Sequence, residues 1–223
     1  MIRFFSKERG NIALLTLGLM SIMIILFLFL TNFVKVFSLK EQASTNAQQA
    51  SLAATSVVYE EVDEAIDEYE MTLIANGKKI LEGESLSERI NKRQEQYSDL
   101  SQNEAHIKAV DEVLSEELSG HGLDSRVLND IIIDHLTSSQ TLESLKYEVA
   151  DIIATNKGTV SNSVIYYMED SQITVKTSSK YKAIKFDNFI PDDQRDINQT
   201  GTGPEISFVK YLTGWSDVTI ELN

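Results

Sequence analysis

Three histidines and a run of acidic residues are the side chains with the most recognisable chemistry in this sequence. His106, His121 and His135 lie fifteen and fourteen residues apart, so no two have the H-E-x-x-H spacing of a zinc enzyme. The acidic run is helical and lacks the loop glycine of a D-x-D-x-D-G calcium motif. It consists of Glu60, Glu61, Asp63, Glu64, Asp67, Glu68 and Glu70. We interpret the histidines as surface or partly buried side chains and the run as a solvated face, and predict no metal site and no cofactor.

Two further polar patterns are weaker indications of chemistry. Gly201-Thr202-Gly203 is a lone G-x-G without the third glycine or the Lys-Ser/Thr of a phosphate-binding loop. Asp192, Asp193 and Asp196 lie in an acidic loop of a kind that is usually only hydrated. There is no G-x-S-x-G elbow and no cysteine, which excludes thiol nucleophiles and disulfides. With no catalytic constellation in the sequence, we expect the protein not to be an enzyme.

The element that must position all other elements is the apolar stretch from Ile12 to Leu30. It holds nineteen residues without a charge, and about 20 helical residues cross the ~30 Å hydrocarbon core of a bilayer. A buried core helix is the alternative, but this run has no polar face. A cleaved signal usually has a shorter apolar core. We therefore predict an uncleaved transmembrane helix over residues 11–36, after a cytoplasmic N-terminus of residues 1–10.

The distribution of charge predicts the orientation of this helix. Of 20 basic and 34 acidic residues, four basic and one acidic residue precede residue 37, which leaves 16 basic and 33 acidic residues and a net charge of −17. Arg3, Lys7 and Arg9 favour a cytoplasmic N-terminus and an extracytoplasmic body in the cell membrane. The acidic body repels nucleic acid, so we expect no nucleic-acid partner.

The membrane helix continues as a stalk helix over residues 37–76, since no proline or glycine interrupts Phe37 to Ala75. One face of the stalk is a stripe of small residues at helical spacing. These are Ala43, Ala47, Ala50 and Ala54. Such a stripe lets two backbones approach closely, so it packs either on other membrane helices, as in a helix-mediated oligomer, or on the protein's own domain. Asn76-Gly77 ends the helix; a hairpin of Thr72–Ala75 with Lys78–Leu81 is the alternative.

The remainder of the chain divides into a helical region, residues 77–158, and a β region, residues 159–223. The expected helix caps are Ser85 with Glu88 and Ser101 with Glu104, both capping boxes, and Asp124. From residue 159 the apolar period changes to two. The predicted strands are Val160–Met168, Ile173–Thr177, Tyr181–Phe186, Ile206–Leu212 and Val218–Leu222, with a polar loop at 187–204. The predicted class is α+β: an N-terminal transmembrane helix continuing into a long stalk helix, then a helical segment and a C-terminal antiparallel sheet.

Two neighbouring patterns resemble a known family. Arg9-Gly10-Asn11-Ile12-Ala13 opens into the membrane helix, and the alanine-rich segment QASTNAQQASLAAT follows at residues 42–55. Together they resemble the N-terminus of TadE/TadG-like proteins of tight-adherence (Flp) pilus assembly. The resemblance implies a single-pass envelope protein that works with other pilus-assembly proteins, and it makes Gly10 and Asn11 the candidate processing site.

The sequence departs from the family pattern at three points. Leu15 stands five residues after Gly10, where pseudopilin-type members carry a glutamate. Gln48 or Gln49 replaces the usual aspartate before the alanine triplet. The D-x-S-x-S metal motif of some TadG relatives is absent from the sequence, so the metal ion of those relatives is not expected here.

We expect a non-enzymatic, single-pass membrane protein that resembles TadG-like pilus-assembly components. Its acidic extracytoplasmic domain would serve protein–protein interaction with other envelope or pilus-assembly proteins. The alternative is a membrane-tethered sensor or ligand-binding ectodomain, although the short cytoplasmic tail leaves no room for a signalling output. An anchored hydrolase is the least supported function, because no set of catalytic residues is assembled.

Overall fold

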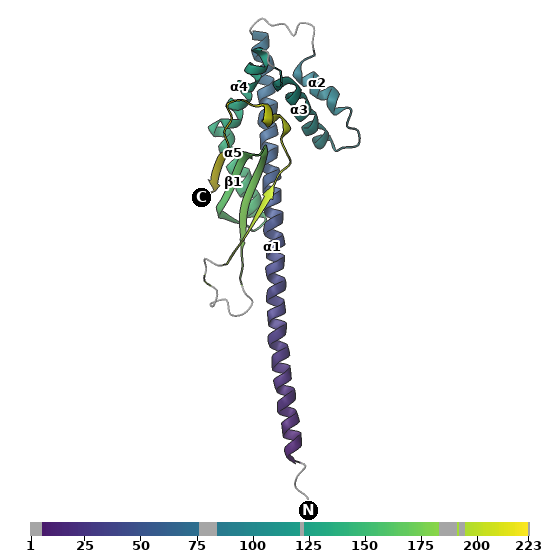
Figure 1. Ribbon diagram of the computed structural model, residues 1–223, viewed down its shortest axis with the longest axis vertical. Helices are drawn as coiled ribbons and strands as arrows, with labels where there is room; N and C mark the ends of the chain where they lie inside the picture. The colour runs from purple at the N-terminus through teal and green to yellow at the C-terminus, as the bar shows by residue number, and fades with distance from the viewer. Residues whose placement is uncertain (1–5, 76–83, 121–122, 183–190, 192–194, 223) are drawn as a thin grey trace, which may run out of the picture.

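One helix of 70 residues, α1 (Ser6–Ala75), organises the whole protein (Figure 1). The structure is a computed structural model and describes residues 6–75, 84–120, 123–182, 191 and 195–222. At 1.5 Å per residue α1 is about 105 Å long. Its N-terminal part projects from the body, and its C-terminal part runs through the body. The prediction that the apolar helix continues without a break into a stalk helix is thus confirmed.

The projecting part of α1 is a candidate membrane span. Its most apolar window has a mean hydropathy of 2.8 and is not buried by any other part of the protein. Large apolar side chains remain exposed from Ile12 to Phe37. A core helix of a soluble protein would bury such side chains, so the exposed apolar surface is consistent with a membrane anchor.

Four shorter helices follow: α2 (Leu86–Gln94), α3 (Gln102–Leu118), α4 (Leu123–Thr137) and α5 (Ser139–Thr155). The capping boxes of Ser85 with Glu88 and of Ser101 with Glu104 are both formed. The prediction for Asp124 is wrong in detail, since α4 already begins at Leu123 and Asp124 lies in its first turn. A carboxylate in a first turn still interacts favourably with the helix dipole.

The β region is one antiparallel sheet in the order β3-β2-β1-β4. Its strands are β1 (Thr159–Glu169), β2 (Gln172–Lys180), β3 (Asp196–Thr202) and β4 (Val218–Leu222). Alternate residues of β1 and β2, such as Ile165, Tyr167, Ile173 and Val175, are buried. The sheet therefore covers the helices with one face only and exposes the other face to solvent.

Two predictions in the β region are wrong, and a third is wrong for the two residues that the structure describes. Ile206–Leu212 is not a strand but contains the 3₁₀ helix η3 (Ser207–Tyr211), whose first amide donates to Asp111 of α3. The predicted polar loop at 187–204 contains β3, which pairs with β2 along its whole length. Tyr181 and Lys182 lie beyond β2 and are not in a strand, and 183–186 is outside the described residues.

The alternative hairpin after the stalk is also excluded for its first half, because Thr72–Ala75 belongs to α1. Its second half, Lys78–Leu81, is outside the described residues.

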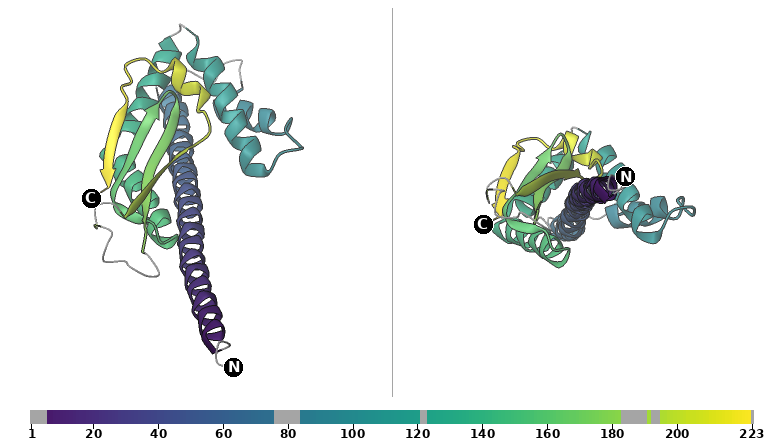
Figure 2. Two further views of the ribbon diagram at one scale, coloured as in Figure 1. Left: turned by 60° about the horizontal axis from the view of Figure 1, so that its bottom comes forward. Right: turned by 90° about the horizontal axis from the view of Figure 1, so that it is seen from below.

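The body is arranged around the C-terminal half of a single helix. The sheet lies on one side of α1, and α2 with α3 lies on the other (Figure 2). The ring of Tyr59 in α1 packs edge-on against the ring of Phe208, so η3 also packs on α1.

Candidate functional site

The junction between the free part of α1 and the body is defined by two contacts. The Tyr181 hydroxyl donates to Asn32 Oδ1 at 3.1 Å, and Lys35 Nζ donates to the carbonyl oxygen of Lys182. Among the described residues these are the contacts of the body closest to the N-terminus of α1. The stretch Ile12–Thr31, which precedes these hydrogen bonds, is about 30 Å of helix, and this length matches the hydrocarbon thickness of a bilayer. The candidate span is thus followed directly by the first hydrogen bonds to the body, at Asn32 and Lys35.

The alanine stripe of α1 is buried by the protein's own body. Its members are Ala43, Ala47, Ala50 and Ala54, each with no exposed surface. Strand β3 crosses the stripe so closely that a Cβ added to Gly201 would lie 2.3 Å from Ala47 C and Gln48 N. The structure thus realises the second of the two alternatives, packing on the protein's own domain. These four side chains are therefore covered in this fold and are not exposed to a neighbouring helix.

The Gly201-Thr202-Gly203 pattern has a packing explanation. Both glycines face α1, and a Cβ on Gly203 would lie 2.8 Å from Thr55 Oγ1. They belong to β3 and to the residue after it, and not to a loop before a helix N-terminus. Small residues on the helix and glycines on the strand together permit this close approach. The pattern is not a phosphate-binding loop.

Amide side chains of α1 bind the C-terminal end of α5. Gln42 Nε2 and Asn46 Nδ2 donate to the Asn156 carbonyl oxygen at 2.9 and 3.3 Å. Asn156 Nδ2 in turn donates to Gln49 Oε1 at 2.7 Å. Such partners satisfy backbone groups that a helix end leaves free. The segment that carries the family resemblance, residues 42–55, is therefore the part of α1 against which the sheet and α5 pack; we call it the platform.

The acidic run is only partly a solvated face, because several of its carboxylates hold other helices on α1. Asp63 accepts from His106 Nε2 of α3 at 3.0 Å, and this hydrogen bond raises the pKa of His106 above its usual value. Glu70 accepts from the backbone N–H of Ser87 at the start of α2 at 2.8 Å. His135 of α4 lies between carboxylates of the same run. His106 and His135 are partly buried, as predicted, and His121 is outside the described residues.

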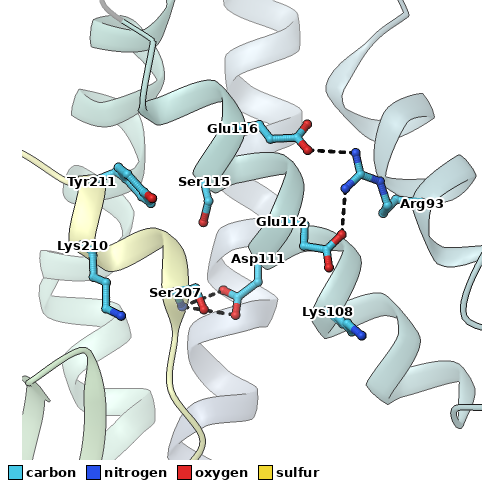
Figure 3. A pocket seen from close by; sticks show the side chains of 9 residues that line it. All are labelled: Arg93, Lys108, Asp111, Glu112, Ser115, Glu116, Ser207, Lys210 and Tyr211. Carbon is cyan, nitrogen blue, oxygen red and sulfur yellow. Dashed lines mark hydrogen bonds and ion pairs between the residues drawn. The ribbon is translucent and has the colours of Figure 1, made fainter.

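A hollow of about 490 Å³ lies between α3 and η3 (Figure 3). Arg93 donates to Glu112 at 2.7 Å and to Glu116 at 2.9 Å, so these three charged groups of its lining are paired with one another. Hydrogen bonding from Tyr97, with Arg93 nearby, lowers the pKa of Glu112. No histidine is among the described residues that line the hollow.

Two lining residues of this hollow are nevertheless distinctive. Asp111 accepts from the backbone N–H of Ser207 at 3.1 Å, and burial raises the pKa of its carboxyl. The Ser115 hydroxyl is buried and has no hydrogen-bond partner among the described residues. A hydroxyl without a partner can bind a small polar group, but it cannot by itself perform a reaction.

The candidate processing site lies in the first turns of α1. Gly10 and Asn11 have helical backbones there. Leu15, five residues after Gly10, is 72% exposed. Cleavage after Gly10 stays a prediction.

The fold and the junction define a class: a protein with an N-terminal candidate membrane anchor that is continuous with the core helix of an α+β body. A family model described as Flp pilus-assembly TadE/G-like matches residues 10–57. No curated protein matches the chain. No solved structure matches it either.

The matched segment confirms the resemblance of the N-terminal region to TadE/TadG-like proteins. It contains the apolar part of α1, the alanine stripe and the amide side chains that bind α5. Together with the candidate span, the match supports a membrane protein related to pilus assembly. The body beyond residue 57 lies outside the match.

Proposed function

We propose that this protein is a non-enzymatic, single-pass component of a Flp-type pilus-assembly apparatus, and that its body binds other envelope proteins outside the cytoplasm. The observation that carries the proposal is the double role of residues 10–57. The segment that matches the family contains the free apolar helix and also the platform on which the sheet and α5 pack. Anchor and body therefore act as one unit.

The proposed orientation has a cytoplasmic N-terminus and an extracytoplasmic body. Arg3, Lys7 and Arg9 precede the apolar part of α1, and the chain beyond residue 36 carries a net charge of −17. Positive residues are retained on the cytoplasmic side of a membrane helix. The acidic body suits partners with basic surfaces, because opposite potentials accelerate and orient association.

Deletion of the protein from its native cell, followed by crosslinking, tests the proposal. We expect loss of pilus or surface-fibre assembly, restored by the wild-type chain. A photo-crosslinking residue at Met71 or Tyr147, which are 62% and 70% exposed, should capture another component of the apparatus. The control is the same residue at Leu26, on the lipid-facing part of α1. Unchanged assembly together with no captured component would refute the proposed function.

A second candidate function, a membrane-tethered ligand-binding ectodomain, is favoured by the unpartnered Ser115 hydroxyl in the hollow of Figure 3. A small polar molecule that occupies this hollow would raise the melting temperature of the full chain in detergent. The increase should be reduced by Ser115→Ala. A screen of small polar molecules with no increase would count against this function and leave the first proposal intact.

A further inference from the structure

Three side chains with metal-binding atoms converge where α4 packs on α1. Glu61 and Glu64 lie three residues apart on one face of α1, and His135 lies in the last turn of α4. Each offers one ligand atom, and these atoms all lie within 4.8 Å of one another. The ligands come from two helices that are far apart in sequence, and one of them is an imidazole. The cluster is therefore more than an acidic patch on a single helix.

A fourth residue, Glu68, fixes the orientation of the imidazole. His135 Nε2 lies 3.0 Å from Glu68 Oε2, a hydrogen-bond distance, whereas His135 Nδ1 lies 3.8 Å from Glu61 Oε2, too far for a hydrogen bond. We assign the proton to Nε2 from these contacts, which leaves the Nδ1 lone pair on the side of Glu61. In metal sites the ligating histidine commonly donates its other N–H to a carboxylate in this manner.

The spacing of the ligand atoms suits a small divalent cation. Zinc binds histidine nitrogen and carboxylate oxygen at about 2.0–2.2 Å, so two ligands of one tetrahedral ion are about 3.4 Å apart. The 3.8 Å between His135 Nδ1 and Glu61 Oε2 is close to that value. The ligand atom of Glu64 lies within 4.8 Å of the other two, so the three side chains must move closer together to reach tetrahedral spacing. Without a cation, a nitrogen lone pair and a carboxylate oxygen would repel each other across this gap.

The local charge also favours a cation. The side chains of Glu61 and His135 are only 17% and 20% exposed, which weakens their hydration. Within the described part of the chain, no lysine or arginine forms an ion pair with Glu61, Glu64 or Glu68. Three carboxylates around one imidazole leave an excess of negative charge that a divalent ion would reduce.

We propose that Glu61, Glu64 and His135 bind a zinc ion that joins α4 to α1, with Glu68 as the carboxylate that orients His135. Three protein ligands leave the fourth position of the ion for water. The proposal departs from the sequence-based expectation of no metal site. It is independent of the proposed function, because it concerns the attachment of α4 to the core helix.

Zinc titration of the full chain in detergent, after removal of metals with a chelator, tests this proposal. Calorimetry with zinc chloride alone should show one saturable site per chain. His135→Asn and Glu64→Gln should each weaken binding at least ~10-fold, and Glu68→Gln should weaken it by roughly 10- to 100-fold, as for other orienting residues. His106→Asn is the matched control: it removes the other histidine–carboxylate pair of α1 and should leave zinc binding unchanged.

A second measurement separates the metal site from a simple ion pair of protonated His135 with its carboxylates. Zinc should raise the melting temperature of the wild type and should have little effect on Glu64→Gln. Because Glu64 is exposed, we expect Glu64→Gln to fold normally, so this variant remains informative if His135→Asn fails to fold. No saturable binding, or equal binding by wild type and Glu64→Gln, would overturn the proposal.

Discussion

Gly201 shows at the scale of a single residue how β3 is held on α1. A Cβ at this position would lie 2.3 Å from the backbone of Ala47 and Gln48, and neither backbone atom can yield without moving the helix or the strand. We expect Gly201→Ala to destabilise the body by about 1–3 kcal/mol or more, as in overpacked cores. Chemical unfolding of the full chain in detergent measures the change. The control is Thr200→Ala, an exposed neighbour on the same strand, and equal stabilities of the two variants would contradict the close approach.

His106 is the residue for which we predict a pH dependence. The hydrogen bond to Asp63 raises the pKa of His106 above its ordinary value of about 6.5, so the folded state holds the proton more tightly than the unfolded state. This stabilisation is fully present below about pH 6.5 and is lost as the pH rises through the raised pKa. It should not exceed roughly 1 kcal/mol, because the side chains of His106 and Asp63 are 30% and 47% exposed.

Urea unfolding at about pH 5.5 and about pH 8.5 measures this contribution on either side of the ordinary histidine pKa. The wild type should lose more stability between the two pH values than Asp63→Asn does. Other titrating groups affect both proteins equally, so the difference between them isolates the pair. The same loss in both proteins would show that the pair does not contribute.

At the scale of secondary-structure elements, a change of side-chain size should affect stability strongly on the buried face of α1 and only weakly on its exposed face. Ala47 has no exposed surface and faces β3, whereas Leu52 is 53% exposed. We expect Ala47→Leu to separate β3 from α1 and destabilise the body by about 1–3 kcal/mol or more, and Leu52→Ala to change stability by less than about 0.5 kcal/mol. Thermal unfolding in detergent compares them. A stable Ala47→Leu variant with altered self-association would instead indicate that the stripe packs against another chain.

The elements that the sequence predicted correctly are those that local patterns determine. The uninterrupted α1, the caps at Ser85 and Ser101, and the strand β1 follow from helix breakers, side-chain capping and a period of two. By contrast, β3 looks like a polar loop because glycines replace its apolar residues where it crosses α1. The sequence of the η3 segment favours a strand, and the contact that accompanies the 3₁₀ helix is a hydrogen bond from its first amide to Asp111, which is far away in sequence.

The candidate site shows the same division between local and tertiary information. The apolar span and the alanine stripe can be read from composition and spacing, but the stripe alone does not determine which surface covers it. His135 and Glu61 lie 74 residues apart, and no local spacing relates them. Only the packing of α4 on α1 brings these two side chains together.

At the scale of the whole molecule, the continuous helix α1 holds the body at a fixed distance from the candidate membrane span. No proline or glycine lies between Phe37 and Ala75, and the contacts at Asn32 and Lys35 hold the body against the helix. Sharp kinks in helices occur mostly at proline or glycine, so α1 is expected to stay straight over this range. A membrane that surrounds Ile12–Thr31 would therefore lie directly beneath the Tyr181 end of the sheet.

This arrangement predicts which positions a membrane-impermeant thiol reagent can reach in intact cells. Because the chain contains no cysteine, any labelling of a single-cysteine variant comes from the introduced residue alone. We expect Gln140→Cys and Thr45→Cys, both exposed on the body side, to be labelled, and Ser6→Cys to be labelled only after lysis. Leu26→Cys, 57% exposed but within the apolar span, should resist labelling until the membrane is dissolved in detergent. Labelling of Ser6→Cys but not Gln140→Cys in intact cells would reverse the orientation, whereas free labelling of Leu26→Cys would show that the apolar helix does not lie in a membrane.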